Sequence, residues 1–257
     1  VYFDTMAPSV SYWDCGEFIA VSYTLGVPHP PGSPLFLLLG RIASMLPVSE
    51  DIAFRVNLLS PLASAFAVLF LYFIIVQLVK HWRGKIETST DALIAFGAGV
   101  VGSMTFAFTD SHWFNAVEAE VYAFSTFFTA IVVWLALLWS EKADEQGNER
   151  YILIIAYMIG LATGLHLLNL LTIPFVALLI YFRKFKFEWT SFGILVALTG
   201  LVFFIIHNVI VKGMPKIADA IGVVATAFLI ITIFAGMVWA VLNHKYLISV
   251  VLTSMVL

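Results

Sequence analysis

Long apolar runs separated by short polar segments organise the chain after a more mixed stretch of about fifty residues. A bilayer core about 30 Å thick requires about 20 apolar residues per helix. The pattern therefore predicts an all-α fold, a polytopic transmembrane helical bundle. The apolar runs are Ile52 to Val79, Ala92 to Thr109, Val121 to Trp139, Tyr151 to Phe182, Ser191 to Val211 and Ala218 to Leu242.

The run Tyr151 to Phe182 is too long for one straight span. Its 32 residues would form a helix of about 48 Å. Gly164, His166, Asn169 and Pro174 lie near its middle, and polar and helix-breaking residues of this kind favour a turn. We expect two short helices joined near His166.

Positive charge is concentrated in four connecting segments, which together hold nine of the thirteen Lys and Arg residues. They fall on one side of the membrane only if the 32-residue run crosses twice. The positive-inside rule then places them in the cytoplasm. The segments are Lys80 to Lys85, Glu141 to Arg150, Arg183 to Lys186 and Asn243 to Tyr246.

The opposite side of the membrane is expected to be acidic and to contain histidines. It receives four Lys and Arg residues but nine of the sixteen carboxylates. The histidines expected on this extracytoplasmic face are His29, His112, His166 and His207.

The chain is expected to divide into an extracytoplasmic first loop, residues 1–51, and a transmembrane helical domain, residues 52–257. Two amphipathic segments of the loop, Trp13 to Leu25 and Pro34 to Leu46, are too short to span a bilayer. The turn-forming run Gly26 to Ser33 separates them. We expect both segments to be helices lying in the outer membrane interface.

Composition agrees with an integral membrane protein. Hydrophobic residues make up 61% of the 257 residues and charged residues 11%, against roughly a quarter charged in soluble domains. The net charge of −3 and the absence of a large basic cluster argue against a nucleic-acid partner. The single cysteine, Cys15, permits neither an internal disulfide nor a cysteine-based zinc site.

The chain starts at Val1 without a methionine and stops inside the apolar run Tyr246 to Leu257, so we expect it to be truncated at its C-terminus.

The first loop contains the densest group of chemically unusual residues. Asp14 and Glu17 precede a Pro-rich turn that contains His29. Carboxylates beside a membrane are costly unless they are solvated, capped or functional. Asp14 could cap a helix with Glu17 reaching back as in a capping box, or the two could serve chemistry. Local spacing alone leaves both interpretations open.

These residues also carry a family resemblance. The string Asp14-x-Gly16-Glu17, followed by Gly26 to Phe36 with its His-Pro-Pro-Gly turn, resembles a family of uncharacterised bacterial membrane proteins. That family is related to an animal transmembrane protein O-mannosyltransferase and looks like a branch of the C-type (GT-C) glycosyltransferases. The similarity covers roughly Ser11 to Pro174.

The resemblance implies an enzyme of the bacterial inner membrane whose first outer loop forms the active site. The donor would be a polyprenyl-phosphate sugar, with mannose expected, and the acceptor a hydroxyl of a protein Ser or Thr or of a glycan. Asp14 matches the general base, which would take the acceptor proton during an inverting attack on the anomeric carbon. Glu17 is expected to orient or cap Asp14.

The departing phosphate needs cations or aligned donors, and six residues are candidates for binding the donor. Arg55 is suited to phosphate but could equally anchor the helix to lipid headgroups. His166 could donate to the phosphate or simply stabilise its turn. Asn115 is expected to cap the next span together with Glu118. Glu120, about 200° around that helix from Glu118, is then expected in the pocket. The donor-binding set is His29, Arg55, Asn57, Glu120, His166 and Asn169.

Two further expectations concern cofactors and the alternative function. A divalent ion held by Asp14, Glu17 and Glu120 is conceivable, but no local ligand spacing supports it, so we expect no cofactor. Trp13, Trp113 and Tyr122 are expected to be aromatic-belt anchors instead of sugar platforms. The alternative function is an ion-coupled transporter or lipid-carrier translocator, which would place unpaired ionisable residues near mid-bilayer. The carboxylates collect at one interface instead, which favours the enzyme.

Overall fold

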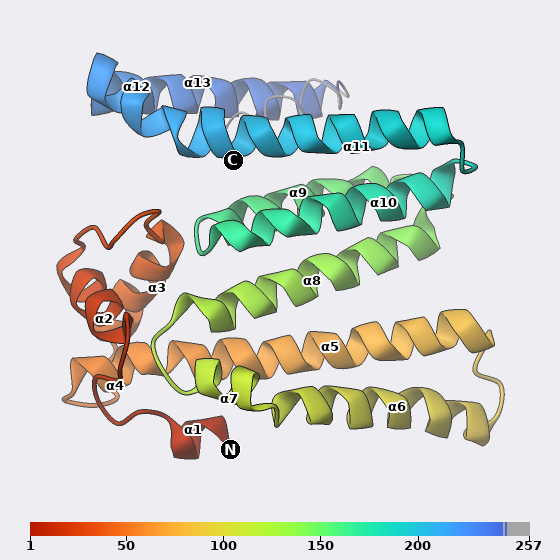
Figure 1. Ribbon diagram of the computed structural model, residues 1–257, viewed down its shortest axis with the longest axis horizontal. Helices are drawn as coiled ribbons and strands as arrows, with labels where there is room; N and C mark the ends of the chain where they lie inside the picture. Colours follow the sequence, from red (N-terminus) through yellow and green to blue (C-terminus); the bar gives the residue numbers. More distant parts are fainter. Residues whose placement is uncertain (244, 246–257) are drawn as a thin grey trace.

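The computed structural model describes residues 1–243 and residue 245, and every regular element in this part of the chain is a helix (Figure 1). The all-α prediction is confirmed, and six helical stretches are long and apolar enough to cross a membrane. The run predicted from Tyr246 to Leu257 lies outside the described residues. The elements are α1 (Tyr2–Thr5), α2 (Cys15–Thr24), α3 (Pro34–Ser44), α4 (Ile52–Asn57), α5 (Leu59–Arg83), α6 (Ser89–Ala107), α7 (Asp110–Ala116), α8 (Val121–Lys142), α9 (Glu149–Thr163), the 3-10 segment η1 (Leu167–Leu171), α10 (Thr172–Lys184), α11 (Trp189–Phe204), the π-helical segment η2 (Ile205–Val211), α12 (Gly213–Ile221) and α13 (Val223–Leu242).

The run that was too long for one span folds into two helices, as predicted. α9 ends at Thr163, the chain turns through Gly164 to His166, and α10 returns beside α9 (Figure 1). α9 has 15 residues, about 22 Å of helix, and it is not among the six candidate spans, whereas η1 and α10 together are. The split is confirmed, with a first helix shorter than a typical span.

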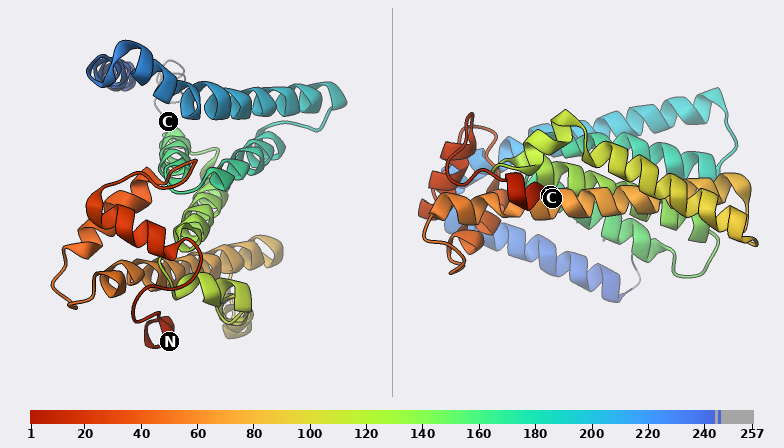
Figure 2. Two further views of the ribbon diagram at one scale, coloured as in Figure 1. Left: turned by 60° about the vertical axis from the view of Figure 1, so that its left-hand side comes forward. Right: turned by 90° about the horizontal axis from the view of Figure 1, so that it is seen from below.

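The two ends of the bundle differ in what they carry. The short helices α2, α3, α4 and α7 and the turn between α9 and α10 lie together at one end of the long helices (Figures 1 and 2). The loops that contain Lys80 to Lys85, Glu141 to Arg150 and Arg183 to Lys186 lie at the other end. Asn243 to Tyr246 is only partly described. The fold therefore separates the candidate site from three of the four basic segments.

Local sequence explains where several helices begin. The Asp51 carboxylate accepts hydrogen bonds from the backbone N–H groups of Ala53 at 2.7 Å and Phe54 at 3.3 Å, which caps α4. Thr88 and Asp91 form a capping box at the start of α6. These contacts satisfy N–H groups that have no partner within the helix.

The predicted cap of the span after α7 is wrong. Asn115 lies inside α7, where its side chain donates to the Ser111 carbonyl at 2.9 Å. α8 begins only at Val121, with Glu120 in the N-cap position. Glu118 and Glu120 therefore lie in an irregular connection, and the helical angle expected between them does not apply.

The C-terminal helices also differ in their boundaries from the predicted runs. The run Ser191 to Val211 is α11 followed by the π-helical η2. The run from Ala218 to Leu242 is interrupted at Gly222, whose φ of 86° is a conformation that favours glycine. α13 therefore begins at Val223.

A hydrophobic core holds the first loop against the bundle. Phe36 of α3 and Leu165 of the α9–α10 turn are completely buried in one cluster with residues of α2, α4 and α8. The rings of Phe18 and Phe36 meet edge to face with centroids 5.3 Å apart. α2 and α3 approach so closely that a Cβ on Gly40 would lie 2.4 Å from the Ser22 Oγ. The two short helices form one packed unit on the end of the bundle.

Candidate active site

Three ionisable side chains of the first loop meet at the start of α2. His29 Nδ1 lies 2.7 Å from Glu17 Oε2, and the backbone N–H of His29 donates to Glu17 Oε1 at 2.7 Å. His29 Nε2 lies 4.0 Å from Asp14 Oδ2. The side chains remain 57% (Asp14), 47% (His29) and 36% (Glu17) exposed. The imidazole therefore lies between two carboxylates that a substrate can reach.

Asp14 and Glu17 do not form a capping box. Asp14 occupies the N-cap position of α2, but its side chain accepts no backbone hydrogen bond there. Glu17 binds His29, twelve residues along the chain, instead of reaching back. Trp13, directly before Asp14, has a φ of 59°, and such backbone strain clusters at functional sites. Helix capping therefore does not explain the presence of these two carboxylates.

Two more carboxylates lie buried next to this cluster. Only 2% of Glu118 and 5% of Glu120 is exposed. Glu118 Oε2 accepts a hydrogen bond from the Ser11 hydroxyl at 2.6 Å, while Oε1 has no partner among the described residues. The buried thiol of Cys15 lies 3.8 Å from Glu120 Oε1. Both carboxylates therefore lie beneath the exposed cluster, out of contact with bulk solvent.

The surroundings shift the pKa values of the cluster in opposite directions. The hydrogen bond from His29 lowers the pKa of Glu17. The same bond raises the pKa of His29, and the carboxylates of Asp14 and Glu120 add to the effect. Burial raises the pKa of Glu120 to about 7, and the charges of Asp14 and Glu118 also raise it. The arrangement favours an imidazolium–carboxylate pair at the surface and a carboxyl group beside it that exchanges its proton near neutral pH.

His166, at the turn between α9 and α10, belongs to the same end of the bundle. The Ser33 hydroxyl donates to the Leu165 carbonyl at 2.8 Å, which fastens the Pro-rich turn to the α9–α10 turn. His166 Nδ1 accepts the Leu168 N–H at 3.3 Å, so the ring proton is placed on Nε2. The Tyr122 ring packs 5.3 Å from the imidazole. His166 thus offers one N–H donor beside the segment that carries Glu120.

The two asparagines of the predicted donor-binding set are buried and fully engaged. Asn57 donates to the carbonyls of Ala7 and Ser9 and accepts the Ala119 N–H at 3.0 Å. Asn169 donates to the carbonyls of Ala162 and His166 at 3.0 Å, and its oxygen accepts two hydroxyls of α8. Both side chains hold segments of the site in place. Their predicted role is therefore indirect: they position the groups around them.

Arg55 is engaged as well. Its guanidinium donates to the Ser44 carbonyl at 2.8 Å and to the Ser49 carbonyl. These bonds fasten the loop after α3 to α4, which carries Arg55. Neither of the alternatives weighed from the sequence, phosphate binding or a lipid-headgroup anchor, anticipated these two partners.

The cluster also contains a possible set of metal ligands. Asp14, Glu17 and His29 each offer a ligand atom within 4.8 Å of the others. Two carboxylates and an imidazole suit several divalent ions. This set differs from the combination considered from the sequence, because Glu120 lies deeper, against Cys15. His29 Nδ1 is already bound to Glu17, so metal binding there would have to break that contact.

Sequence reasoning placed Glu120 in the pocket but missed the rest of the buried layer of the site. Cys15 was read only for disulfides and zinc, and Glu118 only as a cap. The alternation Glu118-Ala119-Glu120 is a weak signal for an extended segment with both acids on one face. His112, expected on the outer surface, is in fact 5% exposed and packs 4.3 Å from the Phe106 ring.

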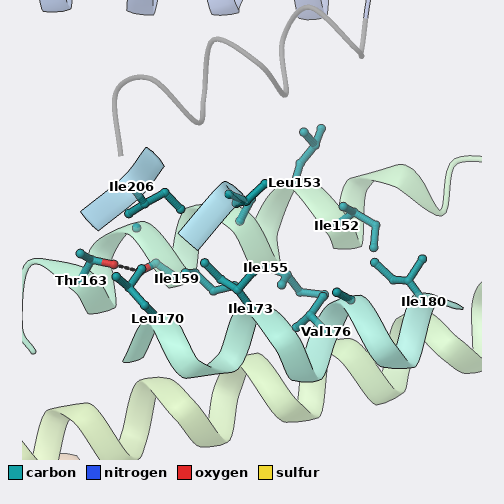
Figure 3. Close-up of a pocket in the computed structure, with 14 residues that line it drawn as sticks. Ile152, Leu153, Ile155, Ile159, Thr163, Leu170, Ile173, Val176, Ile180 and Ile206 are labelled. Atoms are coloured by element: carbon teal, nitrogen blue, oxygen red, sulfur yellow. Dashed lines mark hydrogen bonds between the residues drawn. The ribbon is translucent and has the colours of Figure 1, made fainter. Parts of the chain in front are cut away.

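An apolar cavity of about 380 Å³ lies between α9, α10 and the junction of α11 with η2 (Figure 3). Aliphatic side chains such as Ile155, Ile173 and Ile206 point into it. Thr163, one residue before the turn to His166, lines one end, and its hydroxyl bonds to the Ile159 carbonyl of its own helix. The cavity therefore extends from the level of the His166 turn along the apolar part of the bundle.

Comparisons with known proteins find similar sequences. A family model described as Protein O-mannosyl-transferase TMEM260 N-terminal domain matches residues 14–189, a range that contains all of the candidate site residues. The chain is 30% identical over 219 residues to Protein O-mannosyl-transferase tmem260 of Dictyostelium discoideum, covering 79% of this chain and 24% of that protein. It is 28% identical over 195 residues to Protein O-mannosyl-transferase TMEM260 of Mus musculus, covering 76% of this chain and 26% of that protein.

The chain thus spans about a quarter of the length of these relatives. No solved structure matches it. The family model, by contrast, covers well over half of the chain and begins at the carboxylate that opens the candidate site. On this evidence, the chain belongs to the family of the protein O-mannosyl-transferase TMEM260 N-terminal domain.

Proposed function

We propose that the protein is a membrane glycosyltransferase that moves mannose from a polyprenyl-phosphate carrier to a hydroxyl of a protein acceptor. The observation that carries the proposal is the exposed cluster of Asp14, Glu17 and His29 at one end of a bundle of apolar helices. The names of the relatives support the sugar and the class of acceptor. The proposed site of transfer is the extracytoplasmic face of a bacterial inner membrane, because the basic loops lie at the other end.

In the proposed step, the Asp14 carboxylate takes the proton of the acceptor hydroxyl. The hydroxyl oxygen forms a bond with the anomeric carbon while the bond from that carbon to the phosphate oxygen breaks. The polyprenyl phosphate leaves with the electron pair, and the configuration is inverted. Asp14 suits this role because its carboxylate is exposed and makes no cap bond.

The leaving phosphate would be stabilised by histidines. The hydrogen bond with Glu17 raises the pKa of His29 and so favours its charged form, and His166 presents its Nε2–H at the same end of the bundle. Positive charge and N–H donors aimed at a departing phosphate lower the barrier. We propose Arg55 as a positioning residue, because its guanidinium already binds two carbonyls of the loop.

The lipid part of the donor would occupy the apolar cavity of Figure 3. An isoprenoid chain is a flexible hydrocarbon, and burial of apolar surface is its main source of affinity. The cavity begins at Thr163, three residues before His166, so a chain lying in it would bring its phosphate to the His166 turn. The proposal thus places phosphate and lipid on neighbouring parts of one hairpin.

A transporter or lipid-carrier translocator is the alternative. It would use unpaired carboxylates inside the membrane. In the described candidate spans, the carboxylates are Asp91, Glu141 and Asp219, and each lies within the first or last turn of its span. This distribution favours interfacial chemistry over ion coupling.

Incubation of purified full-length protein with radiolabelled polyprenyl-phosphate sugars and an acceptor protein tests the proposal. Transfer of label from the mannose donor to acceptor Ser or Thr is expected, with loss of the label on β-elimination. Movement of labelled carrier across proteoliposomes without transfer would instead identify a translocator.

A further inference from the structure

At the end of the bundle opposite the candidate active site, a cavity of about 800 Å³ opens between α5, α8 and α10. The three helices all end on this side (Figure 1). Their apolar side chains form the walls, and those of Leu78, Phe175, Leu178 and Phe182 are exposed. The apolar lining residues are Leu78, Leu137, Phe175, Leu178, Leu179 and Phe182.

The cavity becomes polar toward the helix ends. Phe175 precedes Arg183 by eight residues of α10, about 12 Å of helix. His81, Glu141 and Arg183 line the outer part, each in the last turn of its helix. A groove that is apolar inside and charged at its mouth has the polarity gradient of a phospholipid.

The charged groups at the mouth have opposite signs. Arg183 is paired with Asp144, and its Nε donates to the Ser140 carbonyl at 2.9 Å. Among the described residues, neither His81 nor Glu141 takes part in an ion pair. The mouth therefore offers N–H donors and a carboxylate, Glu141, that forms no ion pair among the described residues.

Gln77 adds a second, independent observation. It lies one turn before His81 on the same face of α5 and lines the cavity. Both polar atoms of its amide are buried and have no hydrogen-bond partner in the part of the chain that the structure describes. A buried amide without partners is unfavourable, and a ligand that supplies an acceptor to it would relieve the cost.

We propose that this groove binds one glycerophospholipid with a primary-amine head group, such as phosphatidylethanolamine. An acyl chain packs along Phe175 and Leu179, and a glycerol ester carbonyl accepts a hydrogen bond from the Gln77 amide. The phosphate accepts N–H groups of His81 and Arg183, in the manner of lipid sites between membrane helices. The ammonium donates to Glu141, whose charge disfavours a purely anionic head group.

Photolabelling tests the proposal independently of the transferase reaction. Full-length protein is placed in phosphatidylcholine nanodiscs with a trace of phosphatidylethanolamine that carries a diazirine in its acyl chain. Cross-linked peptides are identified by mass spectrometry, with unlabelled phosphatidylethanolamine, phosphatidylcholine and phosphatidylglycerol as competitors. Labelling is expected to concentrate on 175–183 and 77–81. Phosphatidylethanolamine should compete about tenfold better than the other two lipids, since only it donates an N–H to the carboxylate.

Two variants and a control make the result specific. Glu141→Gln is expected to remove most of the preference for the amine, and Gln77→Leu to lower the yield of labelling without changing that preference. Glu145→Gln is the matched control, because Glu145 lies four residues after Glu141 in the loop that follows α8, pairs with Lys142 and does not line the cavity. Even labelling along all lipid-facing helices, a stronger effect of phosphatidylglycerol, or an unchanged preference in Glu141→Gln would overturn the proposal.

Discussion

At the level of single residues, His29 connects the two carboxylates of the exposed cluster. Its two ring nitrogens face different carboxylates, at 2.7 Å from Glu17 and 4.0 Å from Asp14. Glu17 receives both the ring and the backbone N–H of His29, so it fixes the ring and favours its charged form. In the proposed reaction, that charge faces the departing phosphate.

Replacement of Glu17 by Gln should shift the pH dependence of transfer. Glu17 raises the pKa of His29, so activity that needs the imidazolium is present below that pKa and is lost as the pH rises through it. Glu17→Gln removes the charge, and the alkaline limb of kcat/KM should move to lower pH. The measurement is a pH–rate profile beside Glu50→Gln, an exposed carboxylate of the same loop. An alkaline limb at the same pH in both variants would contradict the role given to His29.

Replacement of Glu120 by Gln should change how stability depends on pH. Burial raises the pKa of Glu120 from 4.5 to about 7. In this window the folded state keeps a proton that the unfolded chain releases. The stabilisation of the folded state by protonated Glu120 is complete below about pH 4.5 and is lost as the pH rises to about 7. Across this range the free energy of unfolding of the wild type should therefore fall by about 1–3 kcal/mol more than that of Glu120→Gln. The measurement is the Tm of both proteins as a function of pH, and the two curves should diverge. Parallel Tm curves would show that Glu120 ionises normally.

The candidate residues were predictable from the sequence, but their contacts were not. Asp14, Glu17 and His29 stood out as polar residues in an apolar chain, and the structure brings them together. The capping box failed because Glu17 finds a stronger partner in His29, which local spacing cannot reveal. Asn57 stood out only through the family resemblance, and its function in linking Ala7 and Ala119 depends on tertiary structure.

At the level of elements, the close contact between α2 and α3 sets the shape of the first loop. A methyl group on Gly40 would lie 2.4 Å from the Ser22 Oγ and 2.8 Å from its Cβ. Gly40→Ala should therefore force the two helices apart and destabilise the protein by about 1–3 kcal/mol, with loss of activity. In the double variant, Ser22→Gly should restore part of the lost stability and part of the lost activity.

Gly97→Ala is the control for that experiment, because nothing lies within 4 Å of a Cβ at Gly97 in the middle of α6. Alanine there should be neutral or stabilise by up to about 1 kcal/mol. Thermal unfolding of the four proteins gives the comparison. Equal effects of Gly40→Ala and Gly97→Ala would show that the α2–α3 contact is not close enough to matter.

The helices themselves were the most predictable part of the fold. Runs of about 20 apolar residues have few alternatives to a membrane helix, and the pair at Tyr151 to Phe182 followed from its length and the polar turn at His166. The start of α8 was mistaken because Asn115 could cap a helix locally, but α7 continues through it. The break at Gly222 was missed because its two direct neighbours, Ile221 and Val223, are both apolar.

At the level of the whole molecule, the fold predicts a specific topology. Lys85 and Lys184 lie at one end of the bundle, and the Pro-rich turn that contains His29 lies at the other (Figure 1). Cysteines introduced at Lys85 and Lys184 should react only after permeabilisation, whereas one at Val27 should react with an impermeant reagent in intact cells. The native Cys15 is fully buried and should not react with the reagent. Labelling of positions 85 and 184 from opposite sides would exclude the α9–α10 hairpin.

The central claim is that Asp14 acts as the base in a sugar transfer at the end of the bundle. The most direct measurement is the transfer rate of Asp14→Asn with a polyprenyl-phosphate mannose donor, beside its melting temperature and its donor binding. Asp14 makes no cap bond, so the variant should fold and bind donor as the wild type does. An amide cannot accept the proton, so the rate should fall by about 10²- to 10⁴-fold. A folded Asp14→Asn protein that transfers mannose within a few-fold of the wild-type rate would contradict the account.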